Sequence, residues 1–203
     1  MHSPRPMPSP MDALNRALRA GDWAAAEALL LKITKKEKRN PEPHFHLGMV
    51  LRRQGRETEA ARAFEKALKI NPNLPQVQFE RGQALMAAGD YREAKRAFLA
   101  ALKAAPGDVG CRANLAMIAR LQGDLDAAIA EFDRLLAEPG LEENQAGLVH
   151  LSLVEALRDR RDYDRMREEG RALGQRQPTL RSAIIRILTE GKSGRFPLRA
   201  SEI

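Results

Sequence analysis

A glycine that returns at a fixed interval is the feature that most constrains the fold of this 203-residue chain. The step is 34 residues, from Gly21 through Gly55 and Gly89 to Gly123. A small residue and an aromatic residue keep the same step: Ala60, Ala94 and Ala128, and Phe64, Phe98 and Phe132. A period of this length is typical of a unit of two helices that buries its apolar face only by stacking on its neighbours. We therefore expect an array of helix pairs, which offers a surface for holding other molecules.

Each period divides into two helices at the glycine. In the second copy the first helix is expected over 43–54, with its apolar residues on one face. Gly55 ends this helix, because glycine adopts the left-handed backbone of a tight turn without steric cost. The second helix is expected over 57–70. The Asn71-Pro72 pair closes it, because proline cannot continue a helix and pushes its predecessor out of helical geometry.

The register extends over most of the chain, so that the array is expected to occupy 11–190. Full units are expected at 7–40, 41–74, 75–108 and 109–142, and a degenerate fifth unit, after a shift of four residues, at 147–180. In the fifth unit Arg161 stands in the place of the glycine and Met166 in the place of the small residue. A capping helix is expected over 180–190, with Thr179 as its N-cap. We expect a disordered, proline-rich lead-in at 1–10 and a flexible tail at 191–203.

This pattern of small residue, glycine turn, alanine, aromatic residue, alanine and proline resembles the tetratricopeptide repeat (TPR) family over about residues 7–180. The resemblance implies an all-α fold, a right-handed α-solenoid of antiparallel helix pairs. It implies about five TPR units and a C-terminal capping helix. It also implies a concave groove, lined by the first helix of each pair, in which partners usually bind. It implies no catalysis.

The resemblance further implies which side chains face the groove. In the second copy these are Phe45, His46, Met49, Arg52 and Arg53, and in the third Phe79, Glu80, Gln83 and Met86. The fourth copy supplies Ala113, Asn114, Met117, Arg120 and Leu121, and the fifth Leu151, Glu155 and Arg158.

The chemistry of these side chains indicates the kind of partner. Phenylalanine and methionine form an adaptable, apolar floor. Four arginines near the C-terminal ends of their helices form an edge that would meet acidic groups: Arg52, Arg53, Arg120 and Arg158. We therefore expect a peptide with apolar and acidic side chains, bound in extended or helical form. The alternative that the sequence leaves open is packing against the next helix, with the arginines stabilising helix C-termini through the dipole.

One familiar ligand of the family is not expected. Members that bind chaperones hold a C-terminal carboxylate with a clamp of basic and asparagine side chains. The corresponding residues in the first three copies are Met11, Asn15, His46, Gln76 and Glu80. Only Asn15 matches, and Glu80 would repel a carboxylate. The sequence therefore lacks this clamp.

No motif for chemistry stands out. His44 and His46 are two residues apart on a helix and point to different sides, so no metal site is expected. Gly191-Lys192-Ser193 imitates the end of a phosphate loop, but no strand precedes it and the upstream glycine is missing. Nucleophiles are not placed beside a base. We expect neither catalysis nor a cofactor.

The net charge of +7 is confined to two segments, because 32–40 carries +4, 181–203 carries +3 and the rest sums to zero. Solvated surfaces and tails account for such segments more readily than nucleic acid or an anionic membrane. Only Phe196 interleaves with the C-terminal bases, so nucleic acid is not expected as a partner.

The compartment is expected to be the cytoplasm. Cys111 is the single cysteine, which excludes an intrachain disulfide and a cysteine-based zinc site. No apolar run reaches the length of a signal peptide core or a membrane span.

The leading hypothesis is a non-catalytic scaffold or adaptor that binds a protein or peptide segment in the groove. Two alternatives remain: a regulatory or targeting module of a larger enzyme or complex, and an electrostatic binder of RNA or anionic membrane. Self-association is also open, because an imperfect end repeat can pair with a second copy.

Overall fold

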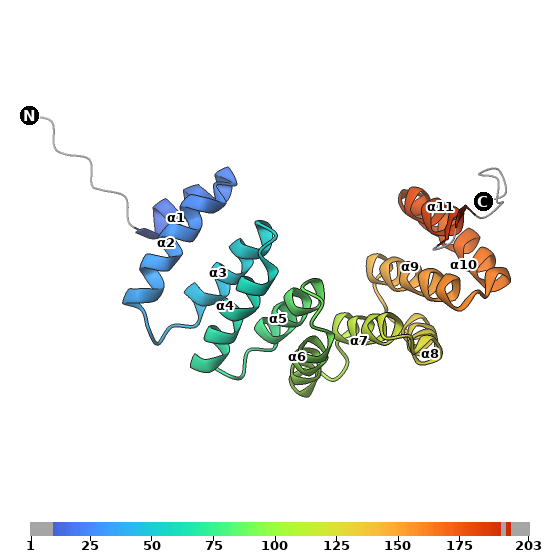
Figure 1. The fold of residues 1–203 in the computed structure, drawn as a ribbon, viewed down its shortest axis with the longest axis horizontal. Helices are drawn as coiled ribbons and strands as arrows, with labels where there is room; N and C mark the ends of the chain where they lie inside the picture. Colours follow the sequence, from blue (N-terminus) through green and yellow to red (C-terminus); the bar gives the residue numbers. More distant parts are fainter. Residues whose placement is uncertain (1–9, 192–193, 196–203) are drawn as a thin grey trace, which may run out of the picture. The chain divides into compact units, whose positions relative to one another are not determined.

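The computed structural model describes residues 10–191 and 194–195, and this part of the chain is helical almost throughout (Figure 1). It divides into two compact units, Met1–Pro106 and Gly107–Ile203. The described helices of the first unit are α1 (Pro10–Ala20), α2 (Trp23–Lys36), α3 (Glu42–Arg53), α4 (Glu57–Ile70), α5 (Pro75–Ala87) and α6 (Tyr91–Ala104). Those of the second are α7 (Val109–Leu121), α8 (Leu125–Leu136), α9 (Glu143–Arg160), α10 (Tyr163–Arg176), the 3₁₀ turn η1 (Pro178–Leu180) and α11 (Arg181–Thr189). The prediction of an all-α solenoid of helix pairs is confirmed.

Two short strands follow the last helix. β1 (Glu190–Gly191) pairs antiparallel with β2 (Gly194–Arg195). The predicted lead-in and tail otherwise fall on 1–9, 192–193 and 196–203, which lie outside the described residues.

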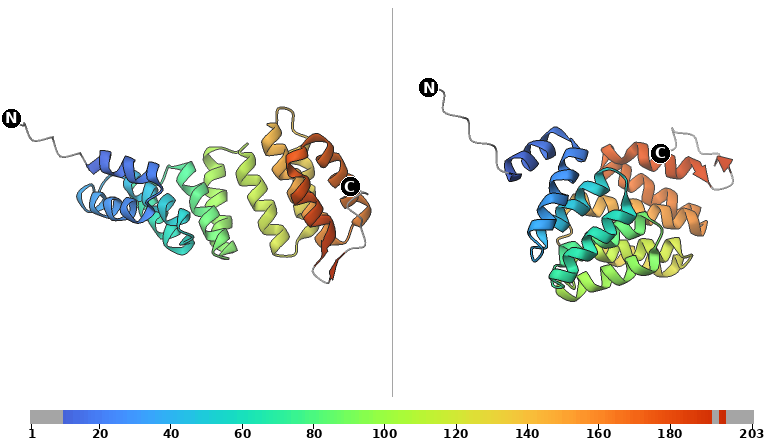
Figure 2. Two further views of the ribbon diagram at one scale, coloured as in Figure 1. Left: turned by 90° about the horizontal axis from the view of Figure 1, so that it is seen from above. Right: turned by 60° about the vertical axis from the view of Figure 1, so that its left-hand side comes forward.

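Within each unit the helices pack in chain order (Figure 2). In the first unit α1 packs on α2, α3 on α4 and α5 on α6, and α2 and α4 also contact the first helix of the next pair. In the second unit α8 contacts both α7 and α9, and α10 contacts both α9 and α11. The helices predicted over 43–54 and 57–70 are confirmed as α3 and α4, within one residue at each end.

The glycine landmarks are the turns between paired helices. Gly21, Gly55, Gly89 and Gly123 have φ between +68° and +90°, where a side chain is disfavoured. Arg161 takes the same left-handed conformation at the equivalent place of the fifth pair, with φ of +67°. It is exposed. The fifth pair therefore keeps the turn of the other pairs without keeping its glycine.

Replacing Arg161 with glycine is expected to raise the free energy of unfolding by about 0.5–1 kcal/mol. Left-handed backbone costs a residue with a side chain roughly 1–2 kcal/mol, and the greater freedom of glycine in the unfolded chain offsets part of this gain. Urea denaturation followed by circular dichroism measures the change. The reciprocal variant Gly123→Arg is the control and should lose about 1 kcal/mol. A destabilised Arg161→Gly protein would contradict the strain argument.

Aspartate caps the second helix of most pairs, a role that the sequence analysis did not assign. The side chain of Asp22 accepts a hydrogen bond from the Ala25 amide at 3.0 Å. Equivalent bonds are made by Asp90, Asp124 and Asp162. Each satisfies an amide that the first turn of a helix leaves without a partner. At the α4 N-terminus Arg56 has this place and makes no cap; it instead pairs with Glu27 and Glu59.

The aromatic landmark is the centre of each regular pair. Phe64, Phe98 and Phe132 are fully buried. The small residue of the first helix makes room for the ring, since a Cβ built on Gly48 would lie 2.5 Å from a ring carbon of Phe64. These two landmarks therefore set how closely the paired helices approach.

The chain departs from the regular pattern at the join between the fourth and fifth pairs and again after the fifth pair. Helix α8 has 12 residues, fewer than the 14 of α4 and α6, while α9 has 18 residues. The closing helix is α11, over Arg181–Thr189, rather than 180–190. Thr179 was expected to cap it but lies inside the 3₁₀ turn η1, because Pro178 starts a helical turn one residue earlier.

Candidate functional site

The first candidate surface lies on α3 and α5, and we call it the α3–α5 face. Its members are Phe45, Met49, Phe79, Gln83 and Met86, all half-buried. Spacings of three and four residues place Phe45 and Met49 on one stripe of α3, and the other three on one stripe of α5. These are the positions that the repeat pattern predicted for the groove.

A hydrogen bond shows that these two stripes lie side by side. The Arg52 guanidinium, one turn beyond Met49 on α3, donates to the Gln83 side-chain oxygen on α5 at 3.1 Å. It also pairs with the Glu80 carboxylate. Arg52 therefore links the first helices of two successive repeats, α3 and α5.

The two phenylalanines of this face are anchored from below. The Phe45 ring centre lies 5.9 Å from that of the buried Phe64, and the Phe79 ring centre lies 5.8 Å from that of Phe98. Aromatic pairs at such distances attract each other beyond the area they bury. Each ring therefore has one side fixed against the core of its own pair and the other side only partly covered.

The basic residues predicted to line the groove edge differ in their surroundings. Arg52 is engaged within the chain, by Glu80, Gln83 and Glu57. Arg53 and His46 are exposed. Among the basic residues predicted for the groove in the second repeat, Arg53 and His46 are therefore the exposed ones.

The second candidate surface lies on α7 and α9, and we call it the α7–α9 face. It presents Met117 and Leu121 on α7, and Leu148 and Leu151 on α9. Leu121 is 45% exposed and Leu148 63% exposed. Leu148 had not been predicted, because the shift of register before the fifth unit placed that unit's first groove position at Leu151.

Arg120 joins the two helices of this face. Its guanidinium donates to Asp159 at 2.6 Å and pairs with Glu155 at 3.0 Å, and its Nε donates to the Met117 sulfur at 3.2 Å. Arg158 also pairs with Asp159. The basic and acidic groups of this face therefore satisfy each other.

Asn114, also predicted for the groove, is half-buried on α7. Its amide donates to the Gly110 carbonyl oxygen of the same helix at 2.8 Å. This bond leaves the side-chain oxygen of Asn114 as the group that a ligand would meet.

Groups that could perform chemistry are scarce in the described part of the chain. No set of three or more His, Cys, Asp or Glu side chains there is arranged to hold a metal ion. Cys111 is buried, and burial together with Asp108 raises the pKa of its thiol to about 12, so the thiolate is not formed near neutral pH. Burial and Lys66 lower the pKa of His44. None of the described helices combines the length and the apolar character that crossing a membrane requires.

The stacked helix pairs, their left-handed turns and the paired faces of the first helices define a TPR protein. The family model described as "Cytochrome c-type biogenesis protein H TPR domain" matches residues 25–146. This match covers more than half of the chain, and the protein belongs to that family. No curated protein matches the sequence at a significant level.

Solved structures show the same fold. MamA from Desulfovibrio magneticus RS-1 (residues 41 to the end) is 22% identical with a TM-score of 0.74, over 84% of this chain and 94% of that one. A tetratricopeptide repeat protein from Parabacteroides merdae ATCC 43184 is 20% identical with a TM-score of 0.72, over 88% and 72%. YrrB, described as a TPR protein with an unusual peptide-binding site, is 17% identical with a TM-score of 0.60, over 79% and 80%.

Proposed function

We propose that this protein is a non-catalytic interaction scaffold that binds a peptide or protein segment on the first helices of its repeats. The observation that carries the proposal is the α3–α5 face. Its rings and methionines lie on adjoining stripes and remain partly open to solvent, and each ring packs on the buried phenylalanine of its own pair. Methionine and phenylalanine in such a place form an adaptable apolar surface.

The contacts refine the chemistry of the partner. Arg52 and Arg120 already have carboxylate partners within the chain, so they offer little to an acidic ligand. The partner therefore binds chiefly through apolar side chains, and an acidic group on it would meet His46 and Arg53 on the first unit. The α7–α9 face, with its exposed leucines, offers apolar contacts of the same kind in the second unit. That YrrB is described as binding peptide supports this use of the fold.

The test removes apolar contact from the face without removing core. Met49→Gln combined with Met86→Gln is expected to reduce capture of the main protein partner from native lysate at least tenfold. The matched control is Leu31→Gln combined with Leu99→Gln, because these leucines are 44% and 46% exposed on second helices of the same unit. The control should capture the partner as the wild type does, and circular dichroism should show the same helix content in all three proteins.

Two outcomes would reject the proposal. Equal capture by the Met49/Met86 variant would show that the face is not used. A partner kept by that variant but released by raising the salt from 50 to about 300 mM would instead assign binding to the basic segments.

A further inference from the structure

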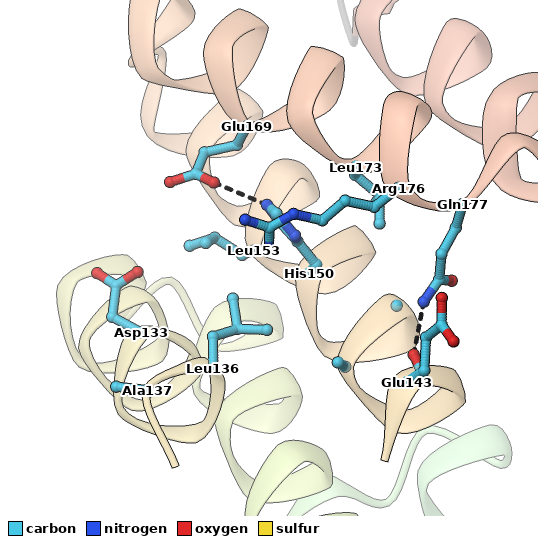
Figure 3. Close-up of a pocket in the computed structure, with 12 residues that line it drawn as sticks. Asp133, Leu136, Ala137, Glu143, His150, Leu153, Glu169, Leu173, Arg176 and Gln177 are labelled. Atoms are coloured by element: carbon cyan, nitrogen blue, oxygen red, sulfur yellow. Dashed lines mark hydrogen bonds and ion pairs between the residues drawn. The ribbon is translucent and has the colours of Figure 1, made fainter. Parts of the chain in front are cut away.

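A cleft of about 560 Å³ lies in the second unit, between the second helices α8 and α10 and over the first half of α9 (Figure 3). Ligand sites in proteins have volumes of roughly 300–1,000 Å³. The proposed function does not use this cleft, which is formed by two second helices and by the side of α9 that carries Gly147, His150 and Leu153.

The irregular join between the fourth and fifth units explains the size of the cleft. Helix α8 stops at Leu136, before Pro139 and the left-handed Gly140, and α9 begins early, at Glu143. The end of α8 therefore leaves a length of α10 uncovered. In the first unit the equivalent hollow, between α2 and α4 over α3, measures only about 190 Å³.

The lining combines leucines with carboxylates. Leu136, Leu153 and Leu173 supply the apolar part. The charged lining groups are three carboxylates and one guanidinium: Asp133, Glu143, Glu169 and Arg176. The lining therefore carries an excess of negative charge next to apolar surface.

Two hydrogen bonds fix the shape of the cleft, as Figure 3 shows. The buried His150 ring lies with its Nε2 2.7 Å from a Glu169 oxygen. The Gln177 amide donates to the Glu143 carbonyl oxygen at 2.5 Å. Gly147 makes room for that amide, because a Cβ there would lie 2.0 Å from the Gln177 oxygen. The cleft is therefore formed before any ligand arrives.

The carboxylates are not all engaged. Glu169 meets both His150 and Arg165. Asp133 meets Arg165 through one oxygen, at 2.5 Å, and no described residue donates to its other oxygen. The exposed carboxylate of Glu143 has no hydrogen bond or ion pair with a described residue either. These two open acceptors lie at opposite ends of the cleft (Figure 3), so a single cation can meet only one of them.

Arg176 shows how such a cation can enter. Its side chain extends across the cleft in the direction of His150 (Figure 3). Its guanidinium makes no hydrogen bond or ion pair with any described residue. A long cationic side chain can thus extend across the cleft, and in the free protein the chain's own arginine has this place.

We propose that the cleft binds a lysine or arginine side chain of a partner peptide. The aliphatic stem of that side chain packs on Leu136, the half-buried leucine of the lining, as such stems do on apolar surface. Its cation lies at the open oxygen of Asp133, at the end of the cleft toward which Arg176 extends (Figure 3). Arg176 competes with it for the same space.

The test uses a defined probe, the capped peptide acetyl-Ala-Leu-Lys-Leu-Ala-amide, titrated into ¹⁵N-labelled protein. Its addition should shift the amide signals of Gly147, His150 and Gln177. The analogue with norleucine in place of lysine should bind at least tenfold more weakly, and the analogue with glutamate should not bind. Tighter binding of the glutamate peptide, or equal binding of all three, would overturn the proposal.

Variants of the full chain separate the cleft from the rest of the surface. Asp133→Asn should weaken the lysine peptide at least tenfold, whereas Glu143→Gln, at the opposite end of the cleft, should leave its binding unchanged. The control Asp164→Asn removes a carboxylate of α10 outside the cleft and should leave binding unchanged. Arg176→Ala, at an exposed site that does not endanger folding, should strengthen binding about threefold by removing the competitor. Weaker binding of the lysine peptide by Arg176→Ala would show that Arg176 contributes to binding and does not compete with the peptide, and would overturn the proposal.

The outcome is independent of the proposed function. The Met49→Gln/Met86→Gln protein should bind the lysine peptide normally, because those methionines belong to the first unit. If the cleft does not bind the lysine peptide, the proposal for the α3–α5 face is unaffected. If the α3–α5 face does not bind a partner, the proposal for the cleft is unaffected.

Discussion

Replacing Phe64 with alanine is expected to lower the free energy of unfolding by about 3–5 kcal/mol, the range measured for loss of a buried phenylalanine. Phe64 is fully buried in the hydrophobic core of the first unit. It fills the space between Gly48 and the Phe45 ring. Other buried residues also pack between α3 and α4, so the two helices close the cavity only in part. The cavity term therefore adds to the lost transfer energy.

Trp23 provides the measurement. It is the only tryptophan of the chain, and it packs partly buried against the same core. Urea denaturation followed by its fluorescence reports on the first unit. Phe64→Leu is the control and should lose only about 1–1.5 kcal/mol, because most of the volume remains. A loss below about 1 kcal/mol for Phe64→Ala would show that the ring is not the centre of the pair.

The same variant connects stability with the proposed binding face. Phe45 rests on Phe64 at 5.9 Å between ring centres, so removal of Phe64 leaves Phe45 without its support. We expect Phe64→Ala to bind the partner of the α3–α5 face less tightly even under conditions where it stays folded. The repeat landmark thus has two consequences, because one ring holds the helix pair together and also positions a side chain for binding.

Local signals in the sequence account for what was predicted well. Gly55 and the Asn71-Pro72 pair act within one turn of themselves, so the ends of α3 and α4 follow from them directly. The landmark Phe64 is buried as expected. The Arg161 turn was also anticipated from its alignment with the glycines, although the sequence alone gave no sign of its backbone conformation.

Contacts between distant residues explain what was missed. Arg120 meets Asp159 39 positions along the chain, and Arg52 meets Gln83 31 positions along it. Whether such residues meet depends on how successive helix pairs stack, and the sequence of a single repeat does not determine this. Glu80 and Glu155 had been placed on the groove, and an arginine one repeat before each of them was the signal that could have indicated pairing.

The cleft of the second unit was not predicted for the same reason, because residues of three helices form it. The four-residue shift after Pro139 was visible as a break in the register. Its structural result was not, because a shift can lengthen a loop, a helix or both. Here the shift lengthens α9 and accompanies a shortened α8. The cleft forms because the short α8 does not cover the whole length of the neighbouring helices.

Replacing Arg120 with alanine is the second large effect that we expect, a loss of about 2–3 kcal/mol. The Arg120 side chain is 11% exposed, and its partners Asp159 and Glu155 are 13% and 28% exposed. Removing one member of a buried ion pair costs about 3–5 kcal/mol because the other charge stays without compensation. Partial access to water at Glu155 reduces this figure. Arg158 remains near Asp159 and reduces it further.

Circular dichroism during urea denaturation measures this effect, because Trp23 lies in the other unit. The matched control is Arg53→Ala, an exposed arginine near the end of a first helix, which should change stability by less than about 0.5 kcal/mol. Asp159→Asn in the Arg120→Ala background should restore about 1 kcal/mol, because it removes the charge left behind. If the second change instead added its full cost to the first, the two side chains would be independent. Arg120 would then be a surface cation open to an acidic partner, as its position on the groove first indicated, rather than the brace between α7 and α9.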